Sequence, residues 1–475
     1  MKLLLFGIGK FYREHREELA YLEDDTVVGF VDNRAADQRS FEGKPVYLPQ
    51  ELGSVLFDGI VLMSGAYGFG HALEMRDQLL QLGIESSRIY YYDQFMARYA
   101  MRHQTIYEGR MHPFQQQGKK LLIVAAPLIF GGGTLAIFFA ATELAHRGWN
   151  ITMAVSAGHP HLIASLQEAG VTVWKIPGLP FLSREQLASW REFDVALVNT
   201  FEHLRLACEL RRILPTLWWI HESSIKNDPV YLHCLDVFSS YGSAECMAGL
   251  RIVAVSQRAA NIFNKRFPAR VDGVMTLGEP APAQISFAAA HHPLRIVTIG
   301  WLGKIKGQEI FMQAVQALPQ ELRERCEFLL IGGDYLPSET SRHIRQMVEA
   351  IPQARWIDVM PRDELAKHFP SFDVIVCASL EETLSMTIVE GMMHGKVCIT
   401  TETTGVAEFL QDGENGYIVK TADVKVLAER LVDVITNYDA LLPLRQAARA
   451  TYETHFSMQA LGDRLEKELS RTKGF

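Results

Sequence analysis

The sequence has few cysteines, and their spacing indicates neither a disulfide framework nor a metal site. Only six occur among 475 residues, at positions 208, 234, 246, 326, 377 and 398. None belongs to a closely spaced pair of the kind found in zinc and redox motifs. Low-complexity tracts are also absent. These absences disfavour a small disulfide-stapled secreted protein and indicate reduced thiols in a globular chain.

An excess of positive charge is absent as well. The 47 Lys and Arg residues are outnumbered by 55 Asp and Glu, which gives a formal net charge of -8. Because such a chain has no general positive field, we expect no nucleic-acid partner. The apolar share of 48% is that of a soluble globular protein, and the length predicts two to four domains.

One uncharged run, Leu121–Thr142, is long enough to cross a bilayer. Its sequence is "LLIVAAPLIFGGGTLAIFFAAT", so Pro127 and the glycines at 131–133 divide it. The two halves have the lengths of a buried strand and a core helix. We therefore favour a strand, a glycine turn and a helix over a membrane span. The N-terminal "MKLLLFGIGK" is too short for a signal peptide.

Strand-like and helix-like segments alternate along most of the chain, which predicts an α/β protein with doubly wound parallel sheets. The pattern divides into a Rossmann-like block over residues 1–118 and two larger blocks over 119–285 and 286–475. Two polar, proline-containing segments, 102–120 and 277–293, are predicted as linkers. The two larger domains would form a cleft between the carboxyl ends of their strands, where such sheets bind ligands.

Two carboxylates eight residues apart, Glu382 and Glu390, stand out in the third block. "FDVIVCAS" predicts a strand, and a helix is predicted from Ser385 to its end at Gly395. Free N–H groups at such a helix start suit a phosphate, and Glu390 would lie roughly 7–8 Å further along the axis. That is about the distance from a diphosphate to a ribose, whose hydroxyls a carboxylate can accept. Two solvated surface acids are the alternative interpretation. The helix-start amides are those of Thr383, Leu384, Ser385 and Met386.

A lysine is predicted at the same edge of the sheet. "LRIVTIG" predicts the first strand of the third block, and "WLGKIKGQ" follows it. Lys306 could meet a pyrophosphate there as a point charge. Lys304 could do the same or face water. A lysine followed by glycine is weak evidence alone and gains weight from sharing a sheet with the two acids.

Several motifs occur in a recognisable order. The third block contains "GWLGKIKGQ", "SLEETLSMTIVEGMM" with its E-x7-E spacing, and "TTGVAEFLQDGENGYIV". The second contains "GGGTLAIFFAATELAHRGWNITM" and "WWIHESS". From about Lys119 onward the chain resembles the members of glycosyltransferase family 4, which are retaining enzymes. The resemblance implies a GT-B type fold, with two Rossmann-like domains facing a cleft, a third small Rossmann-like domain before them, and the last helix packed back on the acceptor domain.

The resemblance also implies roles in the domain that binds the donor. Glu390 would hold the ribose hydroxyls and Lys306 the diphosphate. Glu382 and the four helix-start amides would contact the donor sugar and phosphates. Val359 and Met360, in "DVMPRDEL", would cradle the base.

Roles in the opposite domain follow from the same resemblance. His221 would lie across the cleft near the donor sugar, although the residue pattern alone favours a structural histidine at a strand end. Gly132 and Gly133 would let the backbone approach the phosphates. Two positions depart from the family. Trp301 stands where an arginine is usual, so Lys304 or an arginine from elsewhere would have to replace that cation, and Ser385 stands where a glycine is common.

The chemistry implied is metal-independent transfer on one face of the sugar, with Lys306 and the helix amides stabilising the leaving diphosphate. No D-x-D motif lies near these residues. No cofactor is expected, the donor is a nucleotide-diphosphate sugar, and the acceptor is a glycan or a lipid-linked glycan. The setting implied is surface polysaccharide synthesis in the cytoplasm, and peripheral contact with the inner face of the membrane is left open.

The first block reads as half of a dinucleotide-binding fingerprint. "LLLFGIGKFYREH" predicts a strand, a G-x-G turn and a helix, and Asp32 ends the next strand. The third glycine is missing, because Tyr12 and Arg13 occupy that region. The block resembles short Rossmann-like modules attached to polysaccharide-biosynthesis proteins. A cofactor site, a structural module and a docking module for a partner stay open.

Three other functions compete with glycosyl transfer. A nucleotide-sugar 2-epimerase on the same fold would form product without an acceptor. A catalytically silent scaffold of a glycan-assembly complex would bind no donor, and Trp301 is the feature that favours it. An oxidoreductase using residues 1–118 would bind a nicotinamide cofactor.

Overall fold

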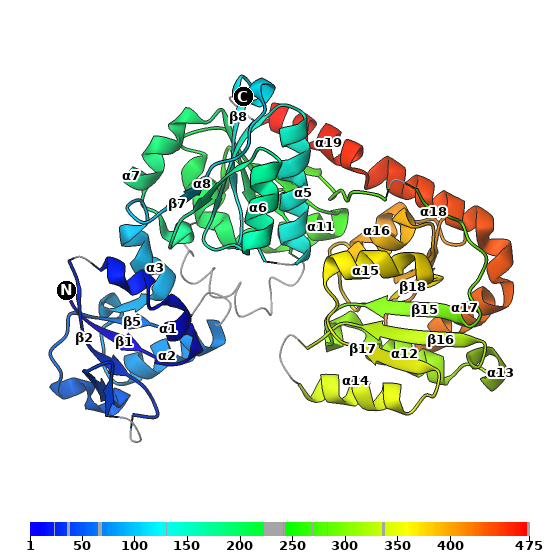
Figure 1. The fold of residues 1–475 in the computed structure, drawn as a ribbon, viewed down its shortest axis with the longest axis horizontal. Coiled ribbons are helices and arrows are strands. Elements are labelled where there is room, and N and C mark those ends of the chain that lie inside the picture. Colours follow the sequence, from blue (N-terminus) through cyan, green and yellow to red (C-terminus); the bar gives the residue numbers. More distant parts are fainter. Residues whose placement is uncertain are drawn as a thin grey trace.

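The described chain contains three mostly parallel sheets, each flanked by helices (Figure 1). The computed structural model describes residues 1–22, 24–35, 39–64, 69–129, 131–222, 241, 243–267, 269–282, 284–334 and 338–472. The α/β class predicted from the alternating pattern is confirmed. The boundaries 1–118, 119–285 and 286–475 stay predictions.

The first sheet has six strands in the order β3-β4-β2-β1-β5-β6, all parallel except β3. Its strands are β1 (Lys2–Phe6), β2 (Thr26–Val31), β3 (Ser40–Phe41), β4 (Lys44–Tyr47), β5 (Gly59–Leu62) and β6 (Ile89–Tyr91). Its helices are α1 (Lys10–His15), α2 (Phe69–Gln81) and α3 (Tyr92–Met96).

The second sheet has eight strands in the order β14-β13-β12-β11-β8-β9-β10-β7. Its strands are β7 (Thr105–Tyr107), β8 (Lys120–Val124), β9 (Asn150–Val155), β10 (Thr172–Lys175), β11 (Val195–Asn199), β12 (Thr216–Ile220), β13 (Arg251–Ala254) and β14 (Gly273–Val274). Its helices are α4 (Pro113–Gln116), α5 (Gly132–His146), α6 (Pro160–Glu168), α7 (Arg184–Leu187), α8 (Leu204–Leu210), α10 (Ala244–Met247) and α11 (Gln257–Arg266).

The third sheet has six parallel strands in the order β17-β16-β15-β18-β19-β20. Its strands are β15 (Leu294–Ile299), β16 (Cys326–Ile331), β17 (Ala354–Ile357), β18 (Val374–Cys377), β19 (Val397–Thr401) and β20 (Tyr417–Val419). Its helices are α12 (Gln308–Gln316), α13 (Gln320–Arg323), α14 (Glu339–Glu349), α15 (Arg362–His368), α16 (Met386–Met393) and α17 (Val424–Asn437), and α18 (Leu442–His455) and α19 (Met458–Ser470) end the chain.

Both larger sheets reverse their strand order once. In the third sheet the reversal lies between β15 and β18, and in the second it lies between β8 and β11. Ligands of open α/β sheets bind outside the carboxyl ends of the strands at such a switch point. The uncharged run examined above supplies β8 and α5, as its glycine turn predicts.

The first predicted linker, residues 102–120, is not one. Thr105–Tyr107 form β7, which pairs antiparallel with β10 at the edge of the second sheet. Gln115 is buried, and its side chain donates to the carbonyl of Ala145. Long-range pairing thus imposes structure on a segment that has no periodicity of its own.

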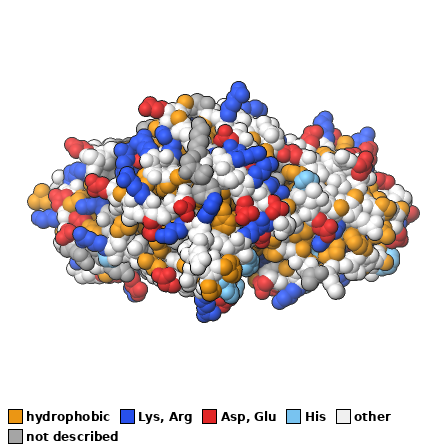
Figure 2. Space-filling view, turned by 90° about the horizontal axis from the view of Figure 1, so that it is seen from above, with side chains coloured by type: hydrophobic (Ala, Val, Ile, Leu, Met, Phe, Trp, Pro, Cys, Tyr) orange, Lys and Arg blue, Asp and Glu red, His pale blue; other side chains and the backbone are white. Residues whose placement is uncertain are grey.

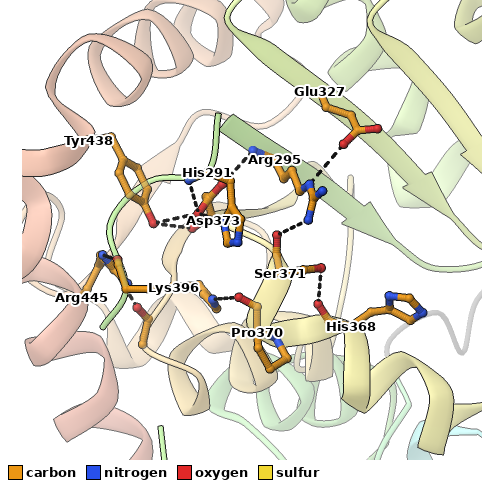
Figure 3. Close-up of polar contacts among 12 residues, drawn as sticks. His291, Arg295, Glu327, His368, Pro370, Ser371, Asp373, Lys396, Tyr438 and Arg445 are labelled. Carbon is orange, nitrogen blue, oxygen red and sulfur yellow. Dashed lines mark hydrogen bonds and ion pairs between the residues drawn. The ribbon is translucent and has the colours of Figure 1, made fainter. Parts of the chain in front are cut away.

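The second predicted linker forms neither helix nor strand between β14 and β15 in the part that is described. Figure 3 shows how its end is fixed at the amino edge of the third sheet. The buried Asp373 accepts from the backbone N–H of Arg295 at 2.8 Å, and His291 Nδ1 lies 2.8 Å from its other oxygen. Asp373 therefore joins the linker, β15 and β18 on the side opposite the carboxyl ends.

The first module is docked on the second sheet's domain. Gln186 donates to the carbonyl of Ala97 at 2.9 Å. Gly178, at φ +64°, lies so close to α3 that a Cβ there would stand 2.2 Å from the carbonyl oxygen of Asp93. A glycine is required at this contact because a side chain would collide with the backbone.

The last helix packs on the second sheet's domain, and Figure 1 shows α19 in red crossing towards it. Leu461, Leu465 and Leu469 form a fully buried stripe on α19. Arg147, at the end of α5, pairs with Asp463 at 2.7 Å and Glu466 at 3.0 Å. Apolar burial holds the helix, and the ion pairs fix its register along α5.

Figure 2 shows Lys and Arg side chains interspersed with Asp and Glu over the face seen from above. Among the helices of the described ranges, none has both the length and the apolar character needed to cross a membrane.

Replacing Arg147 with alanine removes the contacts that fix α19. We expect the free energy of unfolding to fall by about 2 kcal/mol, because three partners of the guanidinium on α19, and Glu143 on α5, lose a charged donor. Thermal unfolding and limited proteolysis of α19 measure this. Arg355→Ala is the control, because Arg355 is 73% exposed and makes a single pair with Glu327. Equal melting temperatures for the two variants would contradict the assigned role.

Candidate active site

Lys306 and Glu382 meet at the switch point of the third sheet. Lys306 Nζ lies 2.6 Å from Glu382 Oε2, and the hydroxyl of Ser379 donates to the same oxygen at 3.3 Å. Both charged side chains are about one fifth exposed, at 23% and 20%. The prediction that strand ends bring these residues to one edge is confirmed.

Backbone contacts explain why the two loops lie so close. The N–H of Leu380, after β18, donates to the carbonyl of Ile305, after β15, at 2.8 Å. Gly307 has φ +67°, and a Cβ there would stand 1.9 Å from the carbonyl oxygen of Ala378. The glycine after Lys306 is therefore needed for the loops to touch.

Helix α16 begins beside this pair, with Ser385 as its N-cap. Gly395 ends the helix region at φ +59°, as predicted. The loop before α16 is held by Gly405, whose N–H donates to the carbonyl of Glu382 at 3.0 Å. The free N–H groups of the first turn and the positive end of the helix dipole form a place for an anion.

The second sheet's switch point faces this helix. The side chain of Asn199 donates to the carbonyl of Gly133 at 3.3 Å, which joins the turns after β11 and β8. Thr200 adopts φ +69°, a strained conformation for a β-branched residue. A Cβ on Gly132 would lie 3.3 Å from the sulfur of Met386, so the start of α5 lies against the start of α16.

His221 follows β12 and lines the space between the two domains. Burial lowers its pKa to about 3, so the imidazole is neutral near pH 7. Its ring lies 4.3 Å from that of Trp219, measured between centroids. Nε2 is buried and has no hydrogen-bond partner among the described residues. A neutral imidazole with one unused nitrogen can exchange a single hydrogen bond with a ligand hydroxyl.

A cavity of about 550 Å³ lies between these elements and contains ten of the fourteen candidate residues. They are Gly132, Gly133, His221, Trp301, Lys306, Glu382, Thr383, Leu384, Ser385 and Met386. Their functional roles stay predictions. The remaining four, Lys304, Val359, Met360 and Glu390, are not among its lining residues.

The four remaining candidates differ in their surroundings. Lys304 is exposed, and Val359 is 72% exposed with its side chain against Gly333. Met360 is half-buried. Glu390 is buried and forms an ion pair at 2.9 Å with Arg362, the first residue of α15.

Sequence reasoning missed several residues of the cavity. Gln308 is the most informative, because its side chain donates to the carbonyl of Trp301 at 2.9 Å and so fixes the loop after β15. Its position directly after the "KG" pair was the available signal. The other lining residues that were missed are Val255, Leu277, Thr298, Ile299, Gly300, Cys377, Ser379 and Thr387.

Trp301 forms part of the rim. Its side chain is 44% exposed, and a Cβ on Gly303 would stand 1.9 Å from the nearest carbon of the ring. The ring therefore packs directly on the backbone of Gly303. Among the cavity-lining residues that the structure describes, Lys306 is the one Lys or Arg, and it is paired with Glu382. Lysine and the helix end are therefore the sources of positive potential at this cavity.

A smaller cavity of about 260 Å³ lies in the first module beside Gly7 and Asp32. The Asp32 carboxylate accepts from the N–H of Ile8 at 3.3 Å and of Arg34 at 2.8 Å. Asp32 is therefore engaged in closing the G-x-G turn. Tyr12 is buried and donates to Glu42 at 2.6 Å.

Family models match two parts of the chain. Residues 293–437, which include the third sheet, match the family described as glycosyl transferases group 1. Residues 1–90 match the model described as C2185-like, N-terminal.

Individual proteins show the same likeness. The amylovoran biosynthesis glycosyltransferase AmsK of Erwinia amylovora is 24% identical over 190 residues, which are 38% of this chain and 46% of that protein. The chain thus spans about half the length of this relative. A D-inositol 3-phosphate glycosyltransferase of Corynebacterium diphtheriae is 22% identical over 71% of this chain and 88% of its own length.

Solved structures establish the fold. The crystal structure of Anabaena Alr3699/HepE in complex with UDP-glucose superposes with a TM-score of 0.60 at 17% identity, over 74% of this chain and 99% of that one. The described domains thus have the GT-B fold, two Rossmann-like domains that face a cleft.

The state of His221 can be measured directly. We expect the ring signals of His221 in carbon-labelled histidine NMR to stay constant from about pH 8 to about pH 5, because burial keeps the imidazole neutral. His221→Asn assigns the signal by its loss. A titration midpoint above pH 6 would show that the ring is solvated and accepts a proton, which would contradict its buried position.

Proposed function

We propose that the protein is a retaining glycosyltransferase. It transfers a sugar from a nucleotide-diphosphate sugar to a glycan or lipid-linked acceptor in surface polysaccharide synthesis. The observation that carries this proposal is the meeting of Lys306 and Glu382 beside the start of α16, across the cleft from His221. The group 1 match over residues 293–437 and the glycosyltransferase relatives support it.

Each end of the donor has a counterpart in the site. The diphosphate would lie against Lys306 and the N–H groups of Thr383 to Met386, where point charge and helix dipole add. Its arrival competes with Glu382 for Lys306, which leaves Glu382 able to accept from a sugar hydroxyl. Gly132 and Gly133 would approach the phosphates from the opposite domain, since neither carries a side chain.

The remaining candidates would complete the site. Glu390 would accept the ribose hydroxyls, and Val359 and Met360 would lie along the base. Lys304 would add positive potential from outside the cavity lining. In the transfer step, Lys306 and the α16 amides stabilise charge on the leaving diphosphate. A diphosphate oxygen on the same face accepts the proton of the acceptor hydroxyl as the new glycosidic bond forms, so no metal is required of this scheme.

His221 would orient the donor sugar. Because its imidazole is neutral, it offers a hydrogen bond and no charge to a sugar hydroxyl near Glu382. We propose a cytoplasmic setting with the acceptor presented at the membrane face. The first module is proposed as a docking or structural element, because Asp32 is engaged with its own turn.

A panel of UDP-, GDP-, ADP- and dTDP-sugars tested by thermal shift identifies the donor. We expect at least one to raise the melting temperature, because a ligand that binds only the folded state stabilises it by mass action. Binding followed by product without acceptor would indicate a 2-epimerase. Failure of every nucleotide to bind would contradict the proposal and favour a silent scaffold, and binding of NADH alone would favour an oxidoreductase.

Lys306→Ala is expected to lower transfer by about two to three orders of magnitude, the loss typical of removing one preorganised charge-stabilising group. Glu390→Ala is expected to lower transfer by weakening donor binding, because the ribose hydroxyls lose their acceptor. Circular dichroism checks that both variants remain folded. Lys425→Ala is the control, because Lys425 lies on α17 with its side chain 85% exposed. Wild-type rates for both site variants would show that the site is elsewhere.

Trp301→Arg is expected to tighten nucleotide binding by about tenfold, which is about 1.4 kcal/mol, because it adds a cation where Lys306 is already paired. The gain should shrink at high salt, because the added charge lies at an exposed rim. Trp301→Phe keeps a ring without charge and serves as the control in calorimetry with UDP. Equal affinity of the two variants would show that cation number does not limit binding.

A further inference from the structure

Arg362 makes contacts on both sides of the connection between the two larger domains. Its guanidinium pairs with Glu390 on α16 at 2.9 Å and with Glu279 in the connection after β14. It also lies 5.8 Å from the ring centroid of Phe139 on α5. One side chain therefore touches the proposed ribose acid, the interdomain connection and a helix of the opposite domain.

The two acids that share Arg362 are deeply buried. Their side chains are 4% exposed for Glu279 and 7% for Glu390, against 27% for Arg362. Glu279 is fixed in place, because its N–H donates to the carbonyl of Phe456 and its own carbonyl accepts from Tyr452 of α18. Two buried carboxylates and one guanidinium leave one negative charge without a full partner.

Other charged groups on the elements packed against α16 are engaged elsewhere. Arg445 and Arg449 of α18 donate to the carbonyls of Gly395 and Met393, at the far end of the helix. Lys396 donates to the carbonyl of Pro370. Lys306 pairs with Glu382. In the described chain, the cation paired with Glu390 is thus that of Arg362.

The neighbouring side chains of His394 and Cys398 are neutral near pH 7, so neither supplies a charge that could pair with Glu390. Burial lowers the pKa of His394 to about 4 and raises that of Cys398 beyond the neutral range. Burial also raises the pKa of Glu390, and the guanidinium opposes that shift. An ionised carboxylate accepts two hydroxyl donors, whereas a protonated one has less accepting capacity.

We propose that Arg362 is a positioning residue for nucleotide binding: it favours the ionised form of Glu390, orients that acid for the ribose hydroxyls, and joins it to Glu279 in the interdomain connection. This inference rests on the proposed function and extends it, since Arg362 itself touches no reacting atom. Nucleotide binding at Glu390 and the position of the connection are then coupled through one guanidinium.

The test is calorimetric binding of UDP, GDP and ADP to the full chain from about pH 6 to about pH 9. Because burial raises the pKa of Glu390 to about 7 even with Arg362 in place, wild-type affinity is expected to be constant above about pH 8 and to decline towards pH 6. Arg362→Met leaves Glu390 buried beside Glu279 without a cation, so its decline should begin at higher pH, with affinity falling up to about tenfold for each pH unit until it levels off where the diol contact is lost. Arg362→Lys keeps the positive charge but not the bidentate geometry, and should keep the wild-type pH profile at weaker affinity.

The 2′,3′-dideoxy form of the nucleotide that binds separates positioning from simple stability. The wild type should bind the dideoxy form more weakly than the natural nucleotide. Arg362→Met at low pH should bind the two forms about equally, since that variant has already lost the diol contact. If Arg362→Met does not fold, Arg362→Lys and Glu279→Gln carry the test, because Glu279→Gln leaves Arg362 to pair with Glu390 alone and should move the decline in affinity to lower pH.

An affinity and a pH profile for Arg362→Met equal to those of the wild type would overturn the inference and leave the proposed function standing. A profile for Arg362→Lys shifted as far as that of Arg362→Met would also overturn it. Wild-type protein that binds neither these three nucleotides nor dTDP at any pH would instead contradict the proposed function.

Discussion

The site depends on β15 and β18 lying side by side. Parallel neighbours end at the same edge of a sheet, so the loops after them leave together, and only at the switch point do they diverge to opposite faces. Gly307 and Ala378 then allow the two backbones to touch, which places Lys306 Nζ at 2.6 Å from Glu382. Because the Lys306–Glu382 ion pair is partly exposed, a diphosphate can replace the carboxylate of Glu382 at the lysine.

The two cleft-facing helices, α5 and α16, are linked at their far ends. Arg445 and Arg449 of α18 hold the carboxyl end of α16, and α19 lies along α5 through Arg147. The connection after β14 meets α18 where the hydroxyl of Tyr452 donates to the carbonyl of Glu279. Arg362 lies at this place, next to the proposed ribose acid.

Much of this could be predicted because it is local in the sequence. Periodicity and glycine placed the central strands of both larger sheets, including β8, β15 and β18, and Ser256 caps α11 by accepting from Ala259, as a serine before a helix predicts. Parallel topology then required Lys306 and Glu382 to share an edge. Spacing suggested the phosphate and ribose roles of Lys306, the helix-start amides and Glu390, and the resemblance supplied the roles of the other site residues. The geometry brings most of these residues together without assigning their roles.

What the sequence did not reveal depends on distant partners. Glu390 and Arg362 are 28 positions apart, and Arg362 reads as an ordinary charged residue at a helix start. β7 has three residues, and among the described strands its hydrogen-bonded partner is β10. Lys304 and Lys306 look equivalent, but the 3-10 turn that contains them turns residues two apart to different sides, so Lys306 faces the cavity and Lys304 is exposed.

The most direct test of the account is a crystal structure of the protein with a bound nucleoside diphosphate, UDP first. We expect the diphosphate within hydrogen-bond distance of Lys306 Nζ and the N–H groups at the start of α16, with Glu382 released from the lysine and the ribose hydroxyls on Glu390. A nucleotide in the first module beside Asp32, or a diphosphate away from Lys306 with the Lys306–Glu382 pair intact, would contradict it.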